Sequence, residues 1–176
     1  GMSRDTVRTY YETFAAREWS RLANTADDVL EFELNRRSIA RHLPPAARVL
    51  DIGGGPGRNA LWLAERGHRV VLADLSPTLL ALAREELAAT PTHDRIEEVG
   101  EADICDLARW PTASFDAVLA LGPFYHLTDE ADRAQAANEL ARVVRPGGLI
   151  FVALMPQILF LRRTIANPAE WPHLTQ

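Results

Sequence analysis

A short apolar strand, a run of glycines and an amphipathic helix follow one another directly, and this order constrains the fold more than any other feature of the chain. The strand is expected over Arg48–Ile52, the loop over Gly53–Gly57 and the helix over Arg58–Arg66, with Gly67 as a left-handed residue after its end. Glycine adopts positive φ freely and lets a ligand approach the backbone closely. The unit is therefore typical of a loop that holds a ligand at the start of a helix.

The same alternation of strand and helix continues along the chain. Further strands are expected at Arg69–Asp74, Arg95–Glu101, Ser114–Leu121 and Leu149–Leu154. Helices are expected from Pro77 to about Ala89, with Ser76 as the N-cap, and from Asp129 to Val144. Unbroken apolar strands that alternate with amphipathic helices indicate a parallel sheet covered on both faces. The sequence thus predicts a doubly wound α/β fold, in which a ligand binds beyond the carboxyl ends of the strands.

The N-terminal part of the chain is interpreted as helical, because apolar side chains recur there at helical spacing. The recurring positions are Tyr10, Phe14, Ala15, Val29, Leu30, Phe32 and Ile39. Pro44 and Pro45 then end the helical run.

Composition limits the partner and the compartment. The chain has 176 residues, enough for one domain, and its net charge of −5 gives no electrostatic footprint for a nucleic acid or an anionic membrane. The longest apolar run, Leu149–Leu161, is interrupted by Pro156 and Gln157 and is too short to span a bilayer. A single cysteine, Cys105, excludes an internal disulfide and is typical of a reducing compartment. We therefore expect a cytoplasmic protein that binds neither a membrane nor a nucleic acid. No spacing among the five histidines and the one cysteine suggests a metal site.

An aspartate ends or follows each of the first three strands. Asp51 lies beneath the glycine loop, Asp74 closes the second strand 23 residues later, and Asp103 follows the third strand. A carboxylate at Asp51 repels a pyrophosphate but attracts an ammonium group, and Arg58 stands where a dinucleotide fingerprint needs a small residue. A carboxylate at Asp74 can accept both ribose hydroxyls. These residues favour S-adenosylmethionine (SAM), an adenosine cofactor with an ammonium group and no phosphate, over a nicotinamide dinucleotide.

With these residues in place, the sequence resembles the class I SAM-dependent methyltransferases. The matching segments are Val49–Gly57, Val71–Ser76, Glu101–Asp106, Phe115–Leu127 and Arg142–Gly148, which together cover roughly residues 45–155. The segment Leu121–Leu127 is similar to the small-molecule branch related to ubiquinone and menaquinone methylases. The resemblance implies a Rossmann-like SAM-binding domain over residues 44–176 and an N-terminal helical lid over residues 1–43. It also implies transfer of a methyl group to a small-molecule acceptor, which leaves S-adenosylhomocysteine.

The resemblance also implies roles for single residues. The methionyl end of the cofactor would be held by Asp51 and by the backbone of Gly53, Gly54, Gly55 and Gly57. Tyr11 of the lid either contacts the methionyl carboxylate or belongs to an aromatic helix face packed on the sheet. The ribose would lie at Asp74, the adenine at Leu75, Asp103 and Ile104, and the sulfonium near Leu121 and Gly122.

His126 is the candidate general base, because it is the only histidine that lies just past the fourth strand. The alternative is that it caps or packs the following turn. Phe124 and Tyr125 either line the acceptor pocket or fill the core. Methyl transfer from a sulfonium needs alignment above all, so a base is optional.

One departure from the family concerns the C-terminus. The family's sheet has two further antiparallel strands after the fifth, and we find no room for them in Met155–Gln176. The uncharged strand Leu149–Leu154 would then lie at a sheet edge, which proteins rarely leave open. We expect it to be covered by a tail helix around Ile158–Ile165, by a partner subunit in a homodimer, or by residues missing from a fragment.

Three functions follow from these observations. The first is a SAM-dependent methyltransferase that acts on a small molecule. The second is a SAM-binding protein of the same fold without catalytic activity, which the short C-terminus favours. The third is a nicotinamide-dependent oxidoreductase, which Asp51 and Arg58 disfavour.

Overall fold

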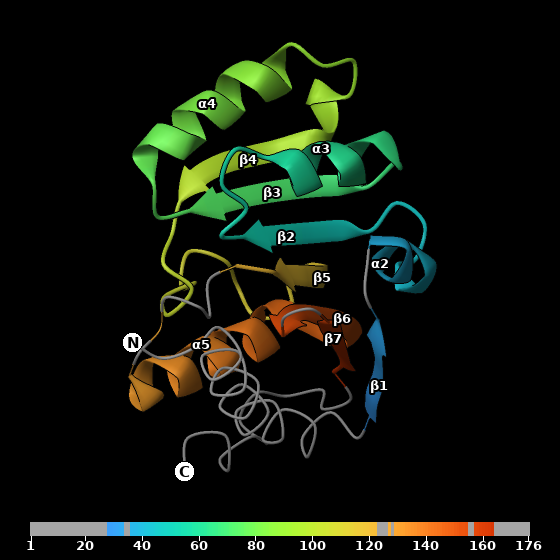
Figure 1. Ribbon diagram of the computed structural model, residues 1–176, viewed down its shortest axis with the longest axis vertical. Coiled ribbons are helices and arrows are strands. Elements are labelled where there is room, and N and C mark those ends of the chain that lie inside the picture. Colours follow the sequence, from blue (N-terminus) through green and yellow to red (C-terminus); the bar gives the residue numbers. More distant parts are fainter. Residues whose placement is uncertain (1–27, 34–35, 123–126, 128, 155–156, 164–176) are drawn as a thin grey trace, which may run out of the picture.

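The computed structural model describes residues 28–33, 36–122, 127, 129–154 and 157–163 (Figure 1). The strands are β1 (Asp28–Glu33), β2 (Arg48–Ile52), β3 (Arg69–Asp74), β4 (Ile96–Glu101), β5 (Phe115–Ala120), β6 (Val144–Leu154) and β7 (Gln157–Arg162). The helices are α2 (Arg36–His42), α3 (Arg58–Glu65), α4 (Pro77–Ala88) and α5 (Glu130–Val143), with a 3₁₀ turn, η1, at His93–Arg95. Within these ranges, no helix combines the length and the apolar character needed to cross a membrane.

All seven strands form one sheet in the order β1-β7-β6-β5-β2-β3-β4. The pairs β2/β3, β3/β4, β2/β5 and β5/β6 are parallel, and β7 is antiparallel to both β6 and β1. From β2 the chain builds outward to β3 and β4, then returns to add β5 and β6 on the other side (Figure 1). The order therefore reverses between β2 and β5, which is where a doubly wound sheet opens a crevice for a ligand.

The helix boundaries follow local signals that the sequence contains. Ser76 caps α4, because its Oγ accepts a hydrogen bond from the Leu79 amide at 3.2 Å, and Pro77 occupies the first helical position. Asp129 caps α5 in the same way through the Ala131 amide, at 2.7 Å. Gly67 adopts a φ of 93° just after α3, as the C-terminal signal predicted.

The two faces of the sheet bury two separate apolar clusters. On one face, alternate strand residues such as Leu50 and Ile52 pack with α5 residues, including Leu140. On the other face, Val49 and Leu72 pack with residues from α2, α3 and α4. Because side chains alternate along a strand, Asp51 belongs to the second face, together with Val49. This alternation decides where the carboxylate of Asp51 can lie.

The helical interpretation of Val29, Leu30 and Phe32 is wrong, whereas that of Ile39, in α2, is confirmed. The backbone of Asp28–Glu33 forms β1, which pairs with β7 from Asp28↔Arg162 to Glu33↔Ile158. A short apolar run is compatible with the periodicity of a helix and with that of a strand, so its pairing partner in the fold decides which of the two forms. Of the expected lid, residues 1–27 and 34–35, Tyr11 among them, lie outside the described residues.

The prediction for the C-terminus is also wrong in its main point. Instead of a tail helix around Ile158–Ile165, the chain forms β7, which pairs with β6 from Leu149↔Arg162 to Leu154↔Gln157. One antiparallel strand therefore follows the fifth parallel strand, where we expected none. The reason is that the open backbone groups of β6 gain partners from the apolar segment that follows next in the chain. The strand Leu149–Leu154 is interior to the sheet, so an open edge there gives no reason to expect a homodimer.

The burial of Leu161 tests this assignment of β7. Leu161 has no exposed surface, so Leu161→Ala is expected to lower the free energy of unfolding by about 2–5 kcal/mol. Leu82→Ala, on the outside of α4 where Leu82 is 42% exposed, is the control and is expected to cost less than about 1 kcal/mol. Urea denaturation measures both. Equal, small losses would contradict the placement of β7 in the sheet.

Candidate functional site

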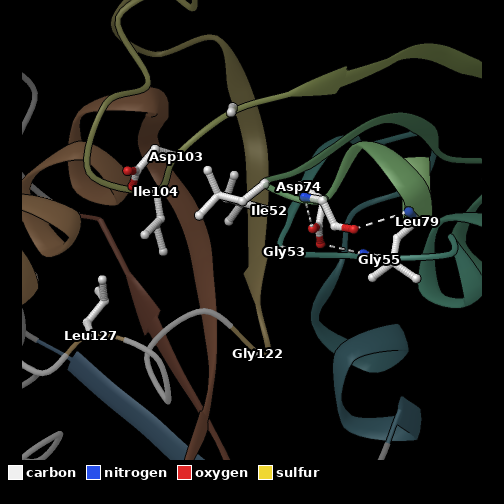
Figure 2. A pocket seen from close by; sticks show the side chains of 12 residues that line it. Ile52, Gly53, Gly55, Asp74, Leu79, Asp103, Ile104, Gly122 and Leu127 are labelled. Carbon is white, nitrogen blue, oxygen red and sulfur yellow. Dashed lines mark hydrogen bonds between the residues drawn. The ribbon is translucent and has the colours of Figure 1, made fainter. Parts of the chain in front are cut away.

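A pocket of about 600 Å³ lies beyond the carboxyl ends of the parallel strands (Figure 2). Its walls come from the segments that follow β2, β3, β4 and β5, on both sides of the point where the strand order reverses. The lining residues that the sequence predicted are Gly53, Gly55, Asp74, Leu75, Asp103, Ile104 and Gly122. Residues separated by about 70 positions in the sequence thus meet in one cavity.

The glycine loop lies directly on the buried side chain of Asp51. A Cβ atom at Gly54 would come within 2.4 Å of Asp51 Oδ2 and 2.4 Å of Leu72 Cδ1, so only a residue without a side chain fits there. Gly53, Gly55 and Gly57 adopt positive φ, which gives the loop its tight turn. The loop can therefore follow the end of β2 closely, with bare backbone between the carboxylate and the pocket.

Asp51 is 1% exposed, and its Oδ2 has no hydrogen-bond partner among the residues that the structure describes. The pKa of the Asp51 carboxyl is raised from its ordinary 3.8 to about 7, mainly by burial and also by the neighbouring Asp74 carboxylate, with Arg36 opposing the rise. A buried carboxylate without a partner is costly, and a cationic group nearby would reduce that cost. This feature fits a ligand with a positively charged end.

Asp74 connects the glycine loop to the start of α4. Its Oδ2 accepts a hydrogen bond from the Gly55 amide at 2.8 Å, and its Oδ1 accepts one from the Ser76 amide at 2.8 Å (Figure 2). A carboxylate has about four lone-pair positions, so each oxygen can accept one more hydrogen bond. Asp74 is partly exposed and lines the pocket, where such bonds could go to vicinal hydroxyls.

Asp103 and Ile104 form the opposite wall in a tight turn after β4. Asp103 Oδ1 accepts a hydrogen bond from the Cys105 amide at 2.8 Å, and the Asp106 amide donates to the Asp103 carbonyl at 2.9 Å. Ile104 is 3% exposed and packs into the cluster on the α5 face. The pocket therefore has an acceptor next to an apolar surface on this side, which suits a flat base that carries an amine.

Five further lining residues were not predicted. They are Ile52, Ser76, Leu79, Ala102 and Leu127. Ser76 and Ala102 lie next to predicted residues, so adjacency could have found them. The three aliphatic side chains carry no polar signal, and only the topology shows that they face the same cavity.

The remaining predicted residues do not line the pocket or cannot be placed. Asp51, Gly54 and Gly57 are not among its lining residues, and Leu121 packs as a half-buried side chain against the cluster on the face of α3 and α4. Tyr11 and His126, like Phe124 and Tyr125, lie outside the described residues.

Two other candidates for reactivity can be judged from the geometry. In the part of the chain that the structure describes, no group of three or more His, Cys, Asp or Glu side chains could hold a metal ion. Burial raises the pKa of the Cys105 thiol to about 11, and the nearby Asp103 and Asp132 contribute to the rise. The thiol also donates a hydrogen bond to the Asp132 carbonyl at 3.3 Å, so this cysteine is not an activated nucleophile.

A comparison with known proteins gives the pocket a family context. The family model described as "Methyltransferase domain" matches residues 50–152, which is more than half of the chain. A demethylmenaquinone methyltransferase from Clavibacter sepedonicus is 35% identical over 80% of this chain and 56% of its own length. A tRNA 5-carboxymethoxyuridine methyltransferase from Escherichia coli K12 is 34% identical over 65% of this chain and 42% of its own length. The chain thus spans about half the length of these relatives.

The fold itself has a close counterpart among solved structures. A SAM-dependent methyltransferase from Methanosarcina mazei superimposes with a TM-score of 0.61 and 22% sequence identity, over 67% of this chain and 57% of that one. The chain belongs to the methyltransferase domain family, as a class I domain whose cofactor is SAM.

Proposed function

We propose that this chain transfers a methyl group from SAM to a small-molecule acceptor, and that SAM binds in the pocket at the strand ends. The observation that carries the proposal is the buried Asp51 carboxylate, which lacks a partner among the described residues and lies under a loop of bare backbone. A ligand whose positive charge comes to rest over this loop relieves that cost, whereas a pyrophosphate adds to it.

The other parts of SAM match the remaining walls of the pocket. The methionyl end would lie over Gly53–Gly57, with its ammonium group above Asp51. The ribose hydroxyls would donate to the oxygens of Asp74 that already hold Gly55 and Ser76. The adenine would lie between Leu75 and Ile104, with its amine at Asp103, and the sulfonium would lie near residues 121 and 122, of which Gly122 lines the pocket.

When bound, SAM supplies a methyl group on a positively charged sulfur, already activated for an in-line displacement. The task of the protein is then to hold the donor still, exclude water and present the acceptor on the correct side. The backbone of the glycine loop and the two carboxylates at Asp74 and Asp103 fix the donor from three strands at once. We propose His126 as a base for acceptors that lose a proton, and Tyr11, in a lid over residues 1–43, as a contact of the methionyl carboxylate.

The nature of the acceptor follows from charge and from the relatives. One relative acts on demethylmenaquinone and another on tRNA, so the family match alone leaves both classes open. A net charge of −5 disfavours a polyanionic acceptor, and the preferred acceptor is therefore a small molecule.

The single cysteine, which is a free thiol, agrees with a cytoplasmic location.

Transfer can be measured with SAM that carries a labelled methyl group. We expect label to appear in a small-molecule acceptor from a panel that contains demethylmenaquinone and simple amines, and not in bulk tRNA. Label in tRNA alone would contradict the proposed acceptor class. Binding of SAM without transfer to any member of a broad panel would favour the non-catalytic binding protein instead.

The role of Asp74 predicts a loss of affinity when its carboxylate is removed. Asp74→Ala should weaken SAM binding by about 10- to 100-fold, because it removes charged acceptors of the ribose hydroxyls. Isothermal titration calorimetry measures the dissociation constant. Asp94→Ala, on the 3₁₀ turn η1, removes an exposed carboxylate away from the pocket and is expected to leave the constant unchanged.

Because Asp74 also holds two backbone amides, Asp74→Asn is a second variant that keeps the shape of the side chain. It should weaken binding less than Asp74→Ala does, while the circular dichroism spectrum stays that of the unchanged protein. An affinity for SAM equal to that of the unchanged protein in both variants would refute the ribose assignment.

The raised pKa of Asp51 predicts a pH-dependent stability in the absence of SAM. Its carboxyl has a pKa of about 7 in the folded chain and 3.8 in its ordinary state, so between these values the folded state binds the extra proton. The stability of the unchanged protein, relative to Asp51→Asn, should therefore fall as the pH rises from about 4 to about 7 and stay level above that, by about 4 kcal/mol over the whole window and about 3 kcal/mol of it above pH 5. Urea denaturation between about pH 5 and pH 8 measures the difference.

The same group predicts the pH dependence of binding. An ammonium group above the loop favours the charged carboxylate, so SAM should bind with lower affinity at about pH 5 than at about pH 7. The affinity of Asp51→Asn should be lower and nearly independent of pH over this range. If Asp51→Asn binds SAM as tightly as the unchanged protein at both pH values, Asp51 does not interact with the methionyl end of SAM.

A further inference from the structure

The loop that carries Asp103 and Ile104 is fastened along one face of α5. Between β4 and β5 the chain runs through residues 102–114 without regular structure apart from an isolated bridge between Asp103 and Asp106. Such a segment must find partners for its backbone groups outside a strand or helix. Four α5 residues, spaced so that they share one helix face, make hydrogen bonds with this loop: Asp132, Gln135, Glu139 and Arg142.

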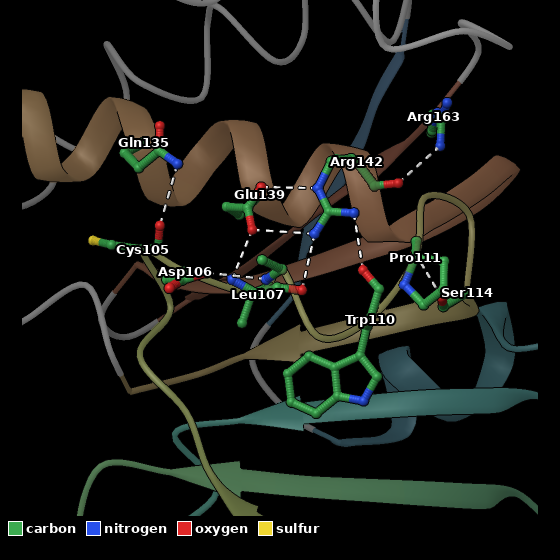
Figure 3. Close-up of polar contacts among 11 residues, drawn as sticks. Cys105, Asp106, Leu107, Trp110, Pro111, Ser114, Gln135, Glu139, Arg142 and Arg163 are labelled. Atoms are coloured by element: carbon green, nitrogen blue, oxygen red, sulfur yellow. Dashed lines mark hydrogen bonds and ion pairs between the residues drawn. The ribbon is translucent and has the colours of Figure 1, made fainter.

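Glu139 and Arg142 form the centre of this contact (Figure 3). The Arg142 guanidinium pairs with both carboxylate oxygens of Glu139, at 2.8 and 3.1 Å. Glu139 Oε2 accepts a hydrogen bond from the Leu107 amide at 2.6 Å. Arg142 donates to the carbonyls of Leu107 and Trp110, both at 2.9 Å. The pair thus holds the loop at both a donor and an acceptor.

These contacts are largely shielded from water, which strengthens their hydrogen bonds. The Glu139 side chain is 11% exposed and that of Arg142 22%. Leu107 is fully buried and Trp110 is 5% exposed, so the loop is also packed on its inner side. Charged hydrogen bonds in such surroundings are stronger than those on the surface, and the planar guanidinium fits two carbonyls and a carboxylate at once.

A single tight turn connects the residues that α5 holds to the pocket residue Asp103. Leu107 directly follows the bridge in which Asp106 pairs with Asp103. Inside that turn the Cys105 amide donates to Asp103 Oδ1, and Gln135 Nε2 donates to the Cys105 carbonyl at 3.2 Å. The direction of the Asp103 carboxylate is therefore set by the backbone of this turn, which side chains of α5 hold from the side away from the pocket.

We propose that Glu139 and Arg142 are positioning residues for the adenine end of the cofactor pocket, and that they determine its selectivity for a base that carries an exocyclic amine. The proposal rests on the proposed function, in which Asp103 and Ile104 receive the adenine. The pair does not touch the cofactor. It acts by holding Asp103 where a carboxylate accepts from an amine but repels a carbonyl.

The test compares two nucleosides that differ at the edge of the base that Asp103 would face: the second has an oxygen in place of the amine and, in its lactam form, a hydrogen on N1. S-adenosylhomocysteine carries the amine, and S-inosylhomocysteine carries a carbonyl in its place. Calorimetry gives the ratio of their dissociation constants for the unchanged protein, Glu139→Gln and Arg142→Lys. The unchanged protein should prefer the adenosyl compound by about tenfold, and both variants should lower this ratio by about threefold or more.

The ratio distinguishes a positioning role from a general loss of stability, because partial unfolding lowers the apparent affinity for both ligands by the same factor. Arg145→Lys is the matched control: Arg145 pairs with Asp116 at 2.6 Å near the opposite ends of the strands, and its substitution should leave the ratio unchanged. Gln135→Ala provides a variant on the exposed part of α5, which is expected to fold even if the buried pair proves essential. It too should lower the ratio.

The outcomes are distinct. A lowered ratio in the α5 variants with an unchanged ratio in Arg145→Lys supports the proposal. A selective unchanged protein whose α5 variants all keep the same ratio overturns it and leaves the proposed function standing. If the unchanged protein binds both compounds equally, Asp103 does not read the amine and the proposal fails. If it binds neither, the proposed function fails as well.

Discussion

The contact between the backbone of Gly54 and the carboxylate of Asp51 is the constraint on which the site depends. A Cβ at position 54 would overlap both Asp51 and Leu72, so the loop can lie this low over β2 only because it has no side chain there. The carboxylate in turn is buried and has no partner among the described residues. Burying it lowers the stability of the folded chain, which an apolar side chain at the same position would not do. Features of this kind, which weaken the fold locally, are typical of functional sites.

The aspartates at the strand ends serve the fold as well as the pocket. Asp74 holds the glycine loop through Gly55 and the start of α4 through Ser76. Asp103 closes its own turn through Cys105. Each carboxylate is therefore oriented before any ligand arrives, so that binding need not spend free energy on ordering it. The hydrogen bonds that order these local turns thus also direct the acceptor oxygens toward the pocket.

The sequence predicted the parallel part of the fold because each signal there is local. Ser76 with Pro77 marks a helix start, Gly67 marks a helix end, and short, mainly apolar runs mark β2, β3 and β5. The signals for β1 and β7 are not local. Residues 28–33 and 157–162 contain apolar runs that suit either a helix or a strand, and only their pairing with each other and with β6 decides between the two. The same distinction holds in the site, where charged and glycine residues were predictable and the aliphatic Leu79 and Leu127 were not.

The α5 face shows how one part of the sequence can serve the site without touching it. A helix-period pattern over residues 130–143 predicts an apolar face for the sheet, and Leu140 and Ala137 fill that role. The polar residues at 132, 135, 139 and 142 share a different face, which in a solvated helix would hold only surface charges. Here Glu139 and Arg142 are largely buried, and their partners are backbone groups of a loop that lies outside any strand or helix. Because a buried charge pair is costly unless every group in it is satisfied, the loop stabilises the pair as much as the pair holds the loop. A wall of the pocket and the helix behind it therefore form one unit, and the geometry of Asp103 depends on both.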